Sequence, residues 1–249
     1  MPAELASLAI IASAFLAGGM IKGILGIGLP LVTVPVIATF TDPLYAISLM
    51  FVPAVTSNIL QARQAGLSKA IVRKYWMVCA GVIIGTTLGT EVLTESDTAT
   101  AQLFLSVVVV LFCISQLMST LPAMSERWRK YVTPVLGSVS GFAGGISGFF
   151  GLVLVPFLLS LRLDKETFVA TIALLYLSGV SALYLSLGLK GELHLDLVAA
   201  SALCALPTLL GVTLGARLRR RIEEQLFRRV LIIALLVIAL NLLRQAIWA

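Results

Sequence analysis

Lys22 and the glycines that follow it are the residues of this chain best suited to bind a ligand. Gly23, Gly26 and Gly28 interrupt an apolar run over residues 5–40, which is too long for one membrane span of about 20 residues. Glycine and proline weaken a helix, and an unwound backbone at membrane depth is buried in protein or lines a cavity. A helix that starts there presents free N–H groups and a positive dipole end, which together favour an anion.

The same pattern recurs in the second half of the chain. Residues 141–156 repeat the glycine spacing of residues 19–35, and further matches follow in the same order. The matched positions are Gly19 with Gly141, Gly23 with Gly145, Gly26 with Gly148, Asp42 with Asp164, Gly66 with Gly188, Gly85 with Gly211, and Gly89 with Gly215. This order predicts an internal duplication: an N-terminal repeat over residues 1–122 and a C-terminal repeat over residues 123–249, within one integral membrane domain.

Lys22 has no counterpart in the second copy, where Gly144 stands at the equivalent position. A lysine inside an apolar run either snorkels to the membrane surface or faces a polar cavity. The sequence leaves both interpretations open. The second interpretation predicts that Lys22 points at the anion, and the difference between the copies then predicts a single bound anion.

Composition places the chain among membrane proteins. Of its 249 residues, 59% are hydrophobic and 12% are charged, about half the charged fraction of a soluble domain. We therefore predict an all-α polytopic membrane protein. The net charge of +6 is carried mainly in short loops, so it indicates topology rather than a nucleic-acid partner. Cysteines stand singly inside apolar runs at Cys79, Cys113 and Cys204, and neither a cofactor nor a metal site is expected.

Each half contains five apolar segments. The predicted segments are 5–22, 28–40, 43–62, 72–91 and 99–121 in the first half, and 132–147, 151–161, 166–187, 194–216 and 226–247 in the second. Segments 28–40 and 151–161 are short, so each is either half of a broken span or the return arm of a re-entrant hairpin. Depending on how these two are counted, eight to ten transmembrane segments are expected.

Loop charges predict the orientation of the chain. The basic loops at 63–75, 122–131 and 217–229 are expected in the cytoplasm, and the more acidic loops at 91–98 and 188–196 outside. Corresponding loops of the two halves therefore lie on opposite faces, so the repeats have inverted topology. Inverted repeats are a transporter architecture with the substrate near the midplane between them. Both termini are then predicted on the outer, periplasmic side.

The third segment of each half follows its glycine-rich break and carries polar residues. Asn58 and Gln61 share one helix face, as do Ser178 and Ser181. These side chains either donate to an oxyanion or join neighbouring helices by hydrogen bonds. Asp42 and Asp164 stand at the starts of their segments and are interpreted as helix N-caps. Glycines spaced by four, as in Gly81, Gly85 and Gly89, are interpreted as helix-packing positions.

These motifs resemble the TauE/SafE sulfite exporter family of membrane permeases over nearly the whole chain. The residues that carry the resemblance are Gly23-Ile-Leu-Gly26-Ile-Gly28-Leu-Pro30 with Pro35, and Gly145-Ile-Ser-Gly148-Phe-Phe-Gly151 with Pro156. The family's usual glycine run is interrupted here by Leu29-Pro30 and by Phe149-Phe150. The resemblance implies transport of sulfite, an organosulfonate or another small sulfur-containing or organic anion across a bacterial inner membrane.

The predicted function is therefore a secondary transporter of a small anion that works by alternating access at the interface of the two repeats. Its substrate-binding residues are expected to be Lys22, Gly23, Gly26, Gly28, Asn58, Gln61, Gly145, Gly148, Ser178 and Ser181. No carboxylate lies deep in a span, so a proton relay of that kind is not visible, although a proton or a sodium ion is the candidate for coupling. An anion channel of the same fold, or an intramembrane enzyme, is the alternative. The enzyme is disfavoured because the chain has a single, peripheral histidine, and a homodimer is compatible with the sequence.

Overall fold

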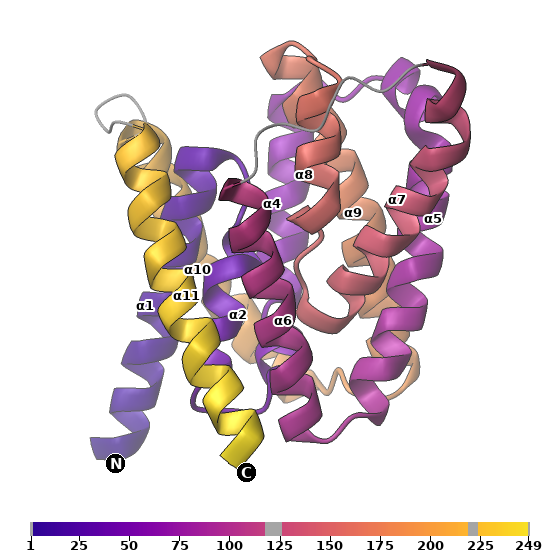
Figure 1. Ribbon diagram of the computed structural model, residues 1–249. Helices are drawn as coiled ribbons and strands as arrows, with labels where there is room; N and C mark the ends of the chain where they lie inside the picture. The colour runs from indigo at the N-terminus through magenta and orange to yellow at the C-terminus, as the bar shows by residue number, and fades with distance from the viewer. Residues whose placement is uncertain (1, 118–125, 219–223, 249) are drawn as a thin grey trace. The chain divides into compact units, whose positions relative to one another are not determined.

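The computed structural model describes residues 2–117, 126–218 and 224–248, which form eleven helices (Figure 1). These are α1 Pro2–Leu25, α2 Leu29–Ala38, α3 Pro43–Leu49, α4 Phe51–Gln64, α5 Lys69–Glu95, α6 Thr98–Leu117, α7 Glu126–Ser147, α8 Gly151–Ser160, α9 Lys165–Leu189, α10 Leu195–Leu218 and α11 Glu224–Trp248. The predicted segment end at 118–121 lies outside the described residues. So do the side chains of the basic residues between positions 122 and 131 and between 219 and 229.

The ten predicted segments are all helical within the described residues, and one of them is broken. Segment 43–62 consists of α3 and α4, which meet at Met50 with a bend of 45°. Pro53 explains the break, because it has no N–H group to donate to the carbonyl of Leu49 and its ring clashes with a continuing helix. The start of α4 is instead held by α10, where the hydroxyl of Ser201 accepts from the N–H of Val52 at 2.9 Å.

Among the described residues, six helices are long and apolar enough to cross a membrane, and the bent pair α3–α4 would make a seventh. The expected eight to ten segments are reached only if the three shorter apolar helices, α2, α8 and the apolar part of α7, are counted as well. The apolar part of α7, Val132–Ser147, is shorter than a full span, and α2 and α8 have ten residues each. A ten-residue helix is about 15 Å long, half of the hydrocarbon core.

The first short helix, α2, runs back along α1. Thr33 of α2 donates to the carbonyl of Ala14 at 3.2 Å, and Gly18 lies directly against the side chain of Thr33. The second short helix, α8, also turns back on the helix before it, because the hydroxyl of Ser140 on α7 donates to the carbonyl of Phe150. Both short segments are therefore return arms of helical hairpins.

The chain divides into two compact units, and each unit takes helices from both halves. The first contains α1, α2, α3, α10, α11 and most of α6, and the second contains most of α4 together with α5, α7, α8 and α9. These units are compact bodies in space and do not coincide with the repeats at 1–122 and 123–249, which remain a prediction about the sequence.

Close helix crossings lie at the centre of both units. In the first unit α1 crosses α10, and a Cβ atom at Gly23 or Gly211 would overlap the carbonyl oxygen of Val212 or Leu16. In the second unit α5 crosses α7, and a Cβ at Gly85 would overlap the carbonyl of Ser138. The packing interpretation of these glycines is confirmed. By the repeat offset α1 corresponds to α7 and α10 to α5, so the same pair of helices forms the crossing in each unit.

Two aspartates begin the helices that follow the short arms, as predicted. Asp42 caps α3 by accepting from the N–H of Leu44 at 2.7 Å, and Asp164 caps α9 by accepting from the N–H of Thr167 at 2.9 Å. The bond from Thr167 stabilises the charged carboxylate and holds the pKa of Asp164 below its usual value.

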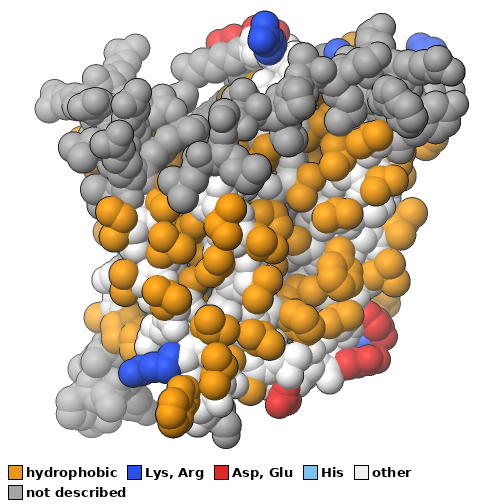
Figure 2. All heavy atoms as spheres, viewed as in Figure 1, with side chains coloured by type: hydrophobic (Ala, Val, Ile, Leu, Met, Phe, Trp, Pro, Cys, Tyr) orange, Lys and Arg blue, Asp and Glu red, His pale blue; other side chains and the backbone are white. Residues whose placement is uncertain are grey.

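Apolar side chains are widely exposed on the helices. On α10, Leu203, Leu206 and Leu210 are each more than 60% exposed. On the face shown in Figure 2, hydrophobic side chains cover the middle of the described helices, and charged side chains appear toward the helix ends. A surface of this kind fits a lipid bilayer and would be unfavourable in water.

Candidate anion-binding site

The first break consists of the turn between α1 and α2. Gly26 closes α1, donating its N–H to the carbonyl of Lys22 at 2.7 Å with a φ of 81°. Gly28 follows with a φ of 103°. Both values lie in the left-handed region, where only glycine is unstrained, so the turn explains why glycine stands at these two positions.

The start of α2 carries no side-chain cap. Gly28 occupies the N-cap position and has no side chain to accept from the first N–H groups. As the first residues of the helix, Leu29 and Leu31 have no intrahelical partner for their N–H groups, and Pro30 between them has none to offer. Because α2 is almost entirely buried, its positive end is a place where an anion would be stabilised.

Lys22 lies one helical turn before this break, and its side chain is only 6% exposed. A lysine that snorkels to the membrane surface would keep its ammonium group in water. The burial of Lys22 therefore favours the interpretation in which its charge stays inside the protein, one turn before Gly26.

The second break begins with the same glycine turn as the first. Gly148 has a φ of 72° and donates its N–H to the carbonyl of Gly144 at 2.7 Å, as Gly26 does to Lys22. The helices that follow, α2 and α8, begin and end 122 residues apart (151 − 29 and 160 − 38). The two breaks thus match in this turn and in the length of the helix that follows, but they differ at the N-cap, where Gly28 has a φ of 103° and Phe150 a φ of −87°.

The side chains at the second break differ. Phe150 stands where the first break has Gly28, and its fully buried ring lies against Gly144, so that any Cβ at Gly144 would overlap it. Gly144 is the counterpart of Lys22. The order of large and small residues is therefore reversed between the breaks. The first break has Lys22 followed by Gly28, whereas the second has Gly144 followed by Phe150.

The structure brings only some of the predicted site residues together. Lys22, Gly26 and Gly28 share the first break, whereas Gly23 and Gly145 lie at the helix crossings, where they have a packing role. Gly148 forms the turn of the second break. The remaining four residues belong to the second unit: Asn58 and Gln61 on α4, and Ser178 and Ser181 on α9.

These four polar residues are not alike. Asn58 is buried and Gln61 partly buried, whereas Ser181 is exposed. Ser178 donates to the carbonyl of Leu174 in its own helix at 3.0 Å, as a serine without a ligand commonly does.

Sequence reasoning missed two residues at the second break. Phe150 was noted only as a departure from a glycine run. Tyr176 of α9 is 4% exposed, and its hydroxyl, which has no hydrogen-bond partner among the described residues, lies against the backbone of Gly151 at the start of α8. Spacing in the sequence carries no signal of either contact. Among the described residues, no three His, Cys, Asp or Glu side chains are grouped as a metal ion would require.

The described residues form membrane-spanning helices together with two half-length helices, α2 and α8, that follow glycine turns. This combination defines a multi-pass membrane protein with a transporter architecture. The model of the sulfite exporter TauE/SafE family matches residues 10–242, and the chain belongs to this family. Members are membrane permeases rather than enzymes, so this protein is a membrane transporter with a small anionic substrate. Searches found no match to a curated protein or to a solved structure.

Proposed function

We propose that the protein exports one sulfite or organosulfonate ion per cycle, and that the ion binds at the first break between Lys22 and the start of α2. The exchange of large and small residues between the two breaks supports this proposal. One break keeps a buried ammonium group beside a glycine turn, and the other is filled by the ring of Phe150.

The donors at the first break match an oxyanion in number and charge. Lys22 has three N–H donors, and the first residues of α2 add backbone donors and the positive end of the helix. Sulfite and sulfonate groups present three oxygens that accept hydrogen bonds. Charge-assisted hydrogen bonds of this kind each contribute roughly 1.5–3 kcal/mol.

The two breaks then have different roles. The first holds the anion, and the second supplies a rigid hairpin whose turn is closed by Phe150 and by Ser147, which accepts from the N–H of Phe149 at 3.2 Å. Contacts of the anion with the other predicted residues, Gly23, Asn58, Gln61, Gly145, Gly148, Ser178 and Ser181, stay a prediction from the sequence.

The transport step is proposed to be alternating access between inverted repeats, driven by a proton or sodium gradient across the bacterial inner membrane. The same crossing of equivalent helices in both units, α1 with α10 and α7 with α5, supports a duplicated origin. A channel would share this fold. It would pass the anion without saturation and would not exchange labelled for unlabelled substrate.

We expect sulfite to stabilise the purified protein and to saturate its transport. A ligand at one hundred times its dissociation constant adds about 2.7 kcal/mol of stability, so the melting temperature should rise with sulfite, less with sulfate and not with chloride. Proteoliposomes loaded with unlabelled sulfite should take up labelled sulfite with saturable kinetics. Linear uptake with no counterflow would indicate a channel, and an unchanged melting temperature with all three anions would contradict the proposed substrate class.

We expect the topology to follow the loop charges. In a variant without Cys79, Cys113 and Cys204, a cysteine placed at Ser68 should be protected from an impermeant thiol reagent added outside the cell, because it lies in the basic loop 63–75 that is predicted in the cytoplasm. A cysteine at Ser96 should be labelled. Labelling of both positions from outside would contradict the inverted topology and the periplasmic placement of the termini.

A further inference from the structure

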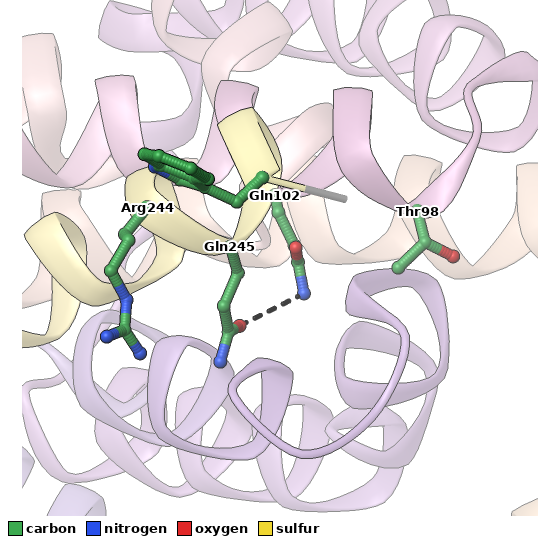
Figure 3. Close-up of a pocket in the computed structure, with 5 residues that line it drawn as sticks. Thr98, Gln102, Arg244 and Gln245 are labelled. Atoms are coloured by element: carbon green, nitrogen blue, oxygen red, sulfur yellow. Dashed lines mark hydrogen bonds between the residues drawn. The ribbon is translucent and has the colours of Figure 1, made fainter.

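A pocket of about 660 Å³ opens in the first unit between the start of α6 and the end of α11 (Figure 3). Its lining residues are Thr98, Gln102, Arg244, Gln245 and Trp248. Gln102 and Gln245 bind the carbonyls of Ala38 and Thr39, which form the end of α2. The pocket therefore lies at the opposite end of α2 from the first break, about 15 Å away along the helix, and is separate from the proposed anion site.

The inner wall of the pocket is held by amide groups. The Nε2 atom of Gln102 donates to the carbonyl of Ala38 at 3.3 Å and to the Oε1 atom of Gln245 at 3.4 Å, as the dashed line in Figure 3 marks. The Nε2 atom of Gln245 donates to the carbonyl of Thr39 at 3.3 Å. These bonds occupy donors of both amides and fix the wall in place. Because the amides are neutral, the positive charge available to a ligand comes from Arg244.

Arg244 is exposed, and its Nη2 atom donates to the Oδ1 atom of Asn241 at 3.1 Å. A guanidinium group carries five N–H donors in a planar fork that suits a phosphate oxygen pair. Trp248, 86% exposed, stands one turn further on. The start of α6 is already capped by Asp97, which accepts from the N–H of Thr100 at 3.1 Å, so Arg244 is the positive group of the pocket. This combination is suited to a phosphate group.

The position of the pocket favours a lipid over a free anion. Trp248 ends the candidate span Leu231–Trp248, and tryptophan at a span end marks the headgroup level of a bilayer. Below Arg244 on the same face of α11 lie Ile233, Val237 and Leu240, which are 62%, 63% and 59% exposed. An apolar track that leads from a cationic pocket into the membrane fits a headgroup with its acyl chains.

An acidic group borders the pocket on its α6 side. Asp42 accepts from the hydroxyl of Thr98, a lining residue, and from the N–H of Leu44. A ligand with negative charge alone would be repelled by this carboxylate, whereas a headgroup that also carries an ammonium group would gain an opposite charge there. We propose that the pocket binds the headgroup of a zwitterionic phospholipid such as phosphatidylethanolamine, with its phosphodiester on Arg244 and its ammonium group toward Asp42.

Native mass spectrometry of the delipidated full-length protein tests this proposal. Titration with phosphatidylethanolamine should give one adduct of higher affinity than the others, and Arg244→Gln should weaken that adduct about tenfold or more. Arg217→Gln, which changes another exposed arginine of the first unit, should leave it unchanged. Phosphatidylglycerol should bind more weakly than phosphatidylethanolamine, and soluble phosphoethanolamine more weakly still.

The results that would overturn the proposal are specific. An adduct that survives Arg244→Gln would place the lipid elsewhere, and equal binding of phosphatidylglycerol would remove the role of Asp42. Soluble phosphoethanolamine binding as tightly as the lipid would assign the pocket to a free phosphate ester. Arg244→Gln should also leave sulfite binding intact, and Lys22→Ala should leave the lipid adduct intact, so each site can fail without the other.

Discussion

Replacing Lys22 by alanine is expected to weaken sulfite binding by about ten- to one hundredfold while the protein stays folded. The change removes a buried ammonium group and with it one or more charge-assisted hydrogen bonds, worth roughly 1.5–3 kcal/mol. Folding does not require the charge, because the equivalent position in the second break is Gly144. The measurement is isothermal titration of the purified variant with sulfite, together with sulfite counterflow in proteoliposomes.

A second lysine provides the control. Lys190 forms an exposed ion pair with Glu91 at 2.9 Å in the second unit, and such pairs contribute little to stability. Lys190→Ala should therefore bind and transport sulfite like the unmodified protein. Normal counterflow in Lys22→Ala, at equal abundance in the membrane, would remove Lys22 from the site and leave the backbone of the helix starts as the remaining donors.

Lys22→Arg separates charge from shape. The guanidinium keeps the positive charge but is larger and planar, so Lys22→Arg is expected to keep only part of the sulfite binding and transport. Partial recovery of sulfite binding would indicate that the charge near α2 matters most. A full loss equal to that of Lys22→Ala would instead indicate that the geometry of the ammonium group is essential.

The positions of the helices along the chain could be predicted because they depend on local sequence. Apolar runs mark the segments, and Gly26, Gly148, Asp42 and Asp164 mark turns and caps through conformations that depend on a few neighbouring residues. The break at Met50 was missed even though Pro53 signals it. A proline in the first turn of a helix is tolerated, so its presence alone does not say on which side the chain breaks.

Contacts between helices that are far apart in the chain could not be predicted from local sequence. The crossing of α1 with α10 joins residues about 190 positions apart (211 − 19), and the repeats alone do not say which copies of the helices meet. The pairing of Gln102 with Gln245 is likewise a contact across 143 positions. The exposed stripe from Ile233 to Arg244 was readable by its helical spacing, but only the fold shows that this stripe ends at a pocket.

The candidate site could also be predicted only in part. Lys22, Gly26 and Gly28 were predicted together because they follow one another in the chain. The closed state of the second break depends on how the Phe150 ring packs on Gly144, on Gly179 and beside Tyr176, whose ring centre lies 5.9 Å away. A phenylalanine in the sequence, at a position where the family has glycine, does not show whether its ring packs into the turn or points away from it.

Gly85→Leu is expected to abolish the folded protein, and Gly85→Ala to lower its melting temperature by several degrees. A Cβ atom at Gly85 would overlap the backbone carbonyl of Ser138, and backbone cannot swing aside as a flexible side chain can. Overpacking of this kind costs about 1–3 kcal/mol or more, and each kcal/mol lowers the melting temperature by about 2–4 °C for a chain of this size. Leu88→Phe, on the exposed face of the same helix, is the control.

The equivalent substitution in the other unit makes this a test of the duplication as well. A Cβ at Gly211 of α10 would overlap the carbonyl of Leu16 on α1, as one at Gly85 of α5 would overlap that of Ser138 on α7. Close approach of small residues stabilises helix pairs in a membrane, where burial of apolar surface does not. Gly211→Ala should therefore lower the melting temperature, measured by size-exclusion chromatography after heating, about as much as Gly85→Ala does. If only one of the two variants, Gly85→Ala or Gly211→Ala, lowered the melting temperature, the two crossings would not be energetically equivalent.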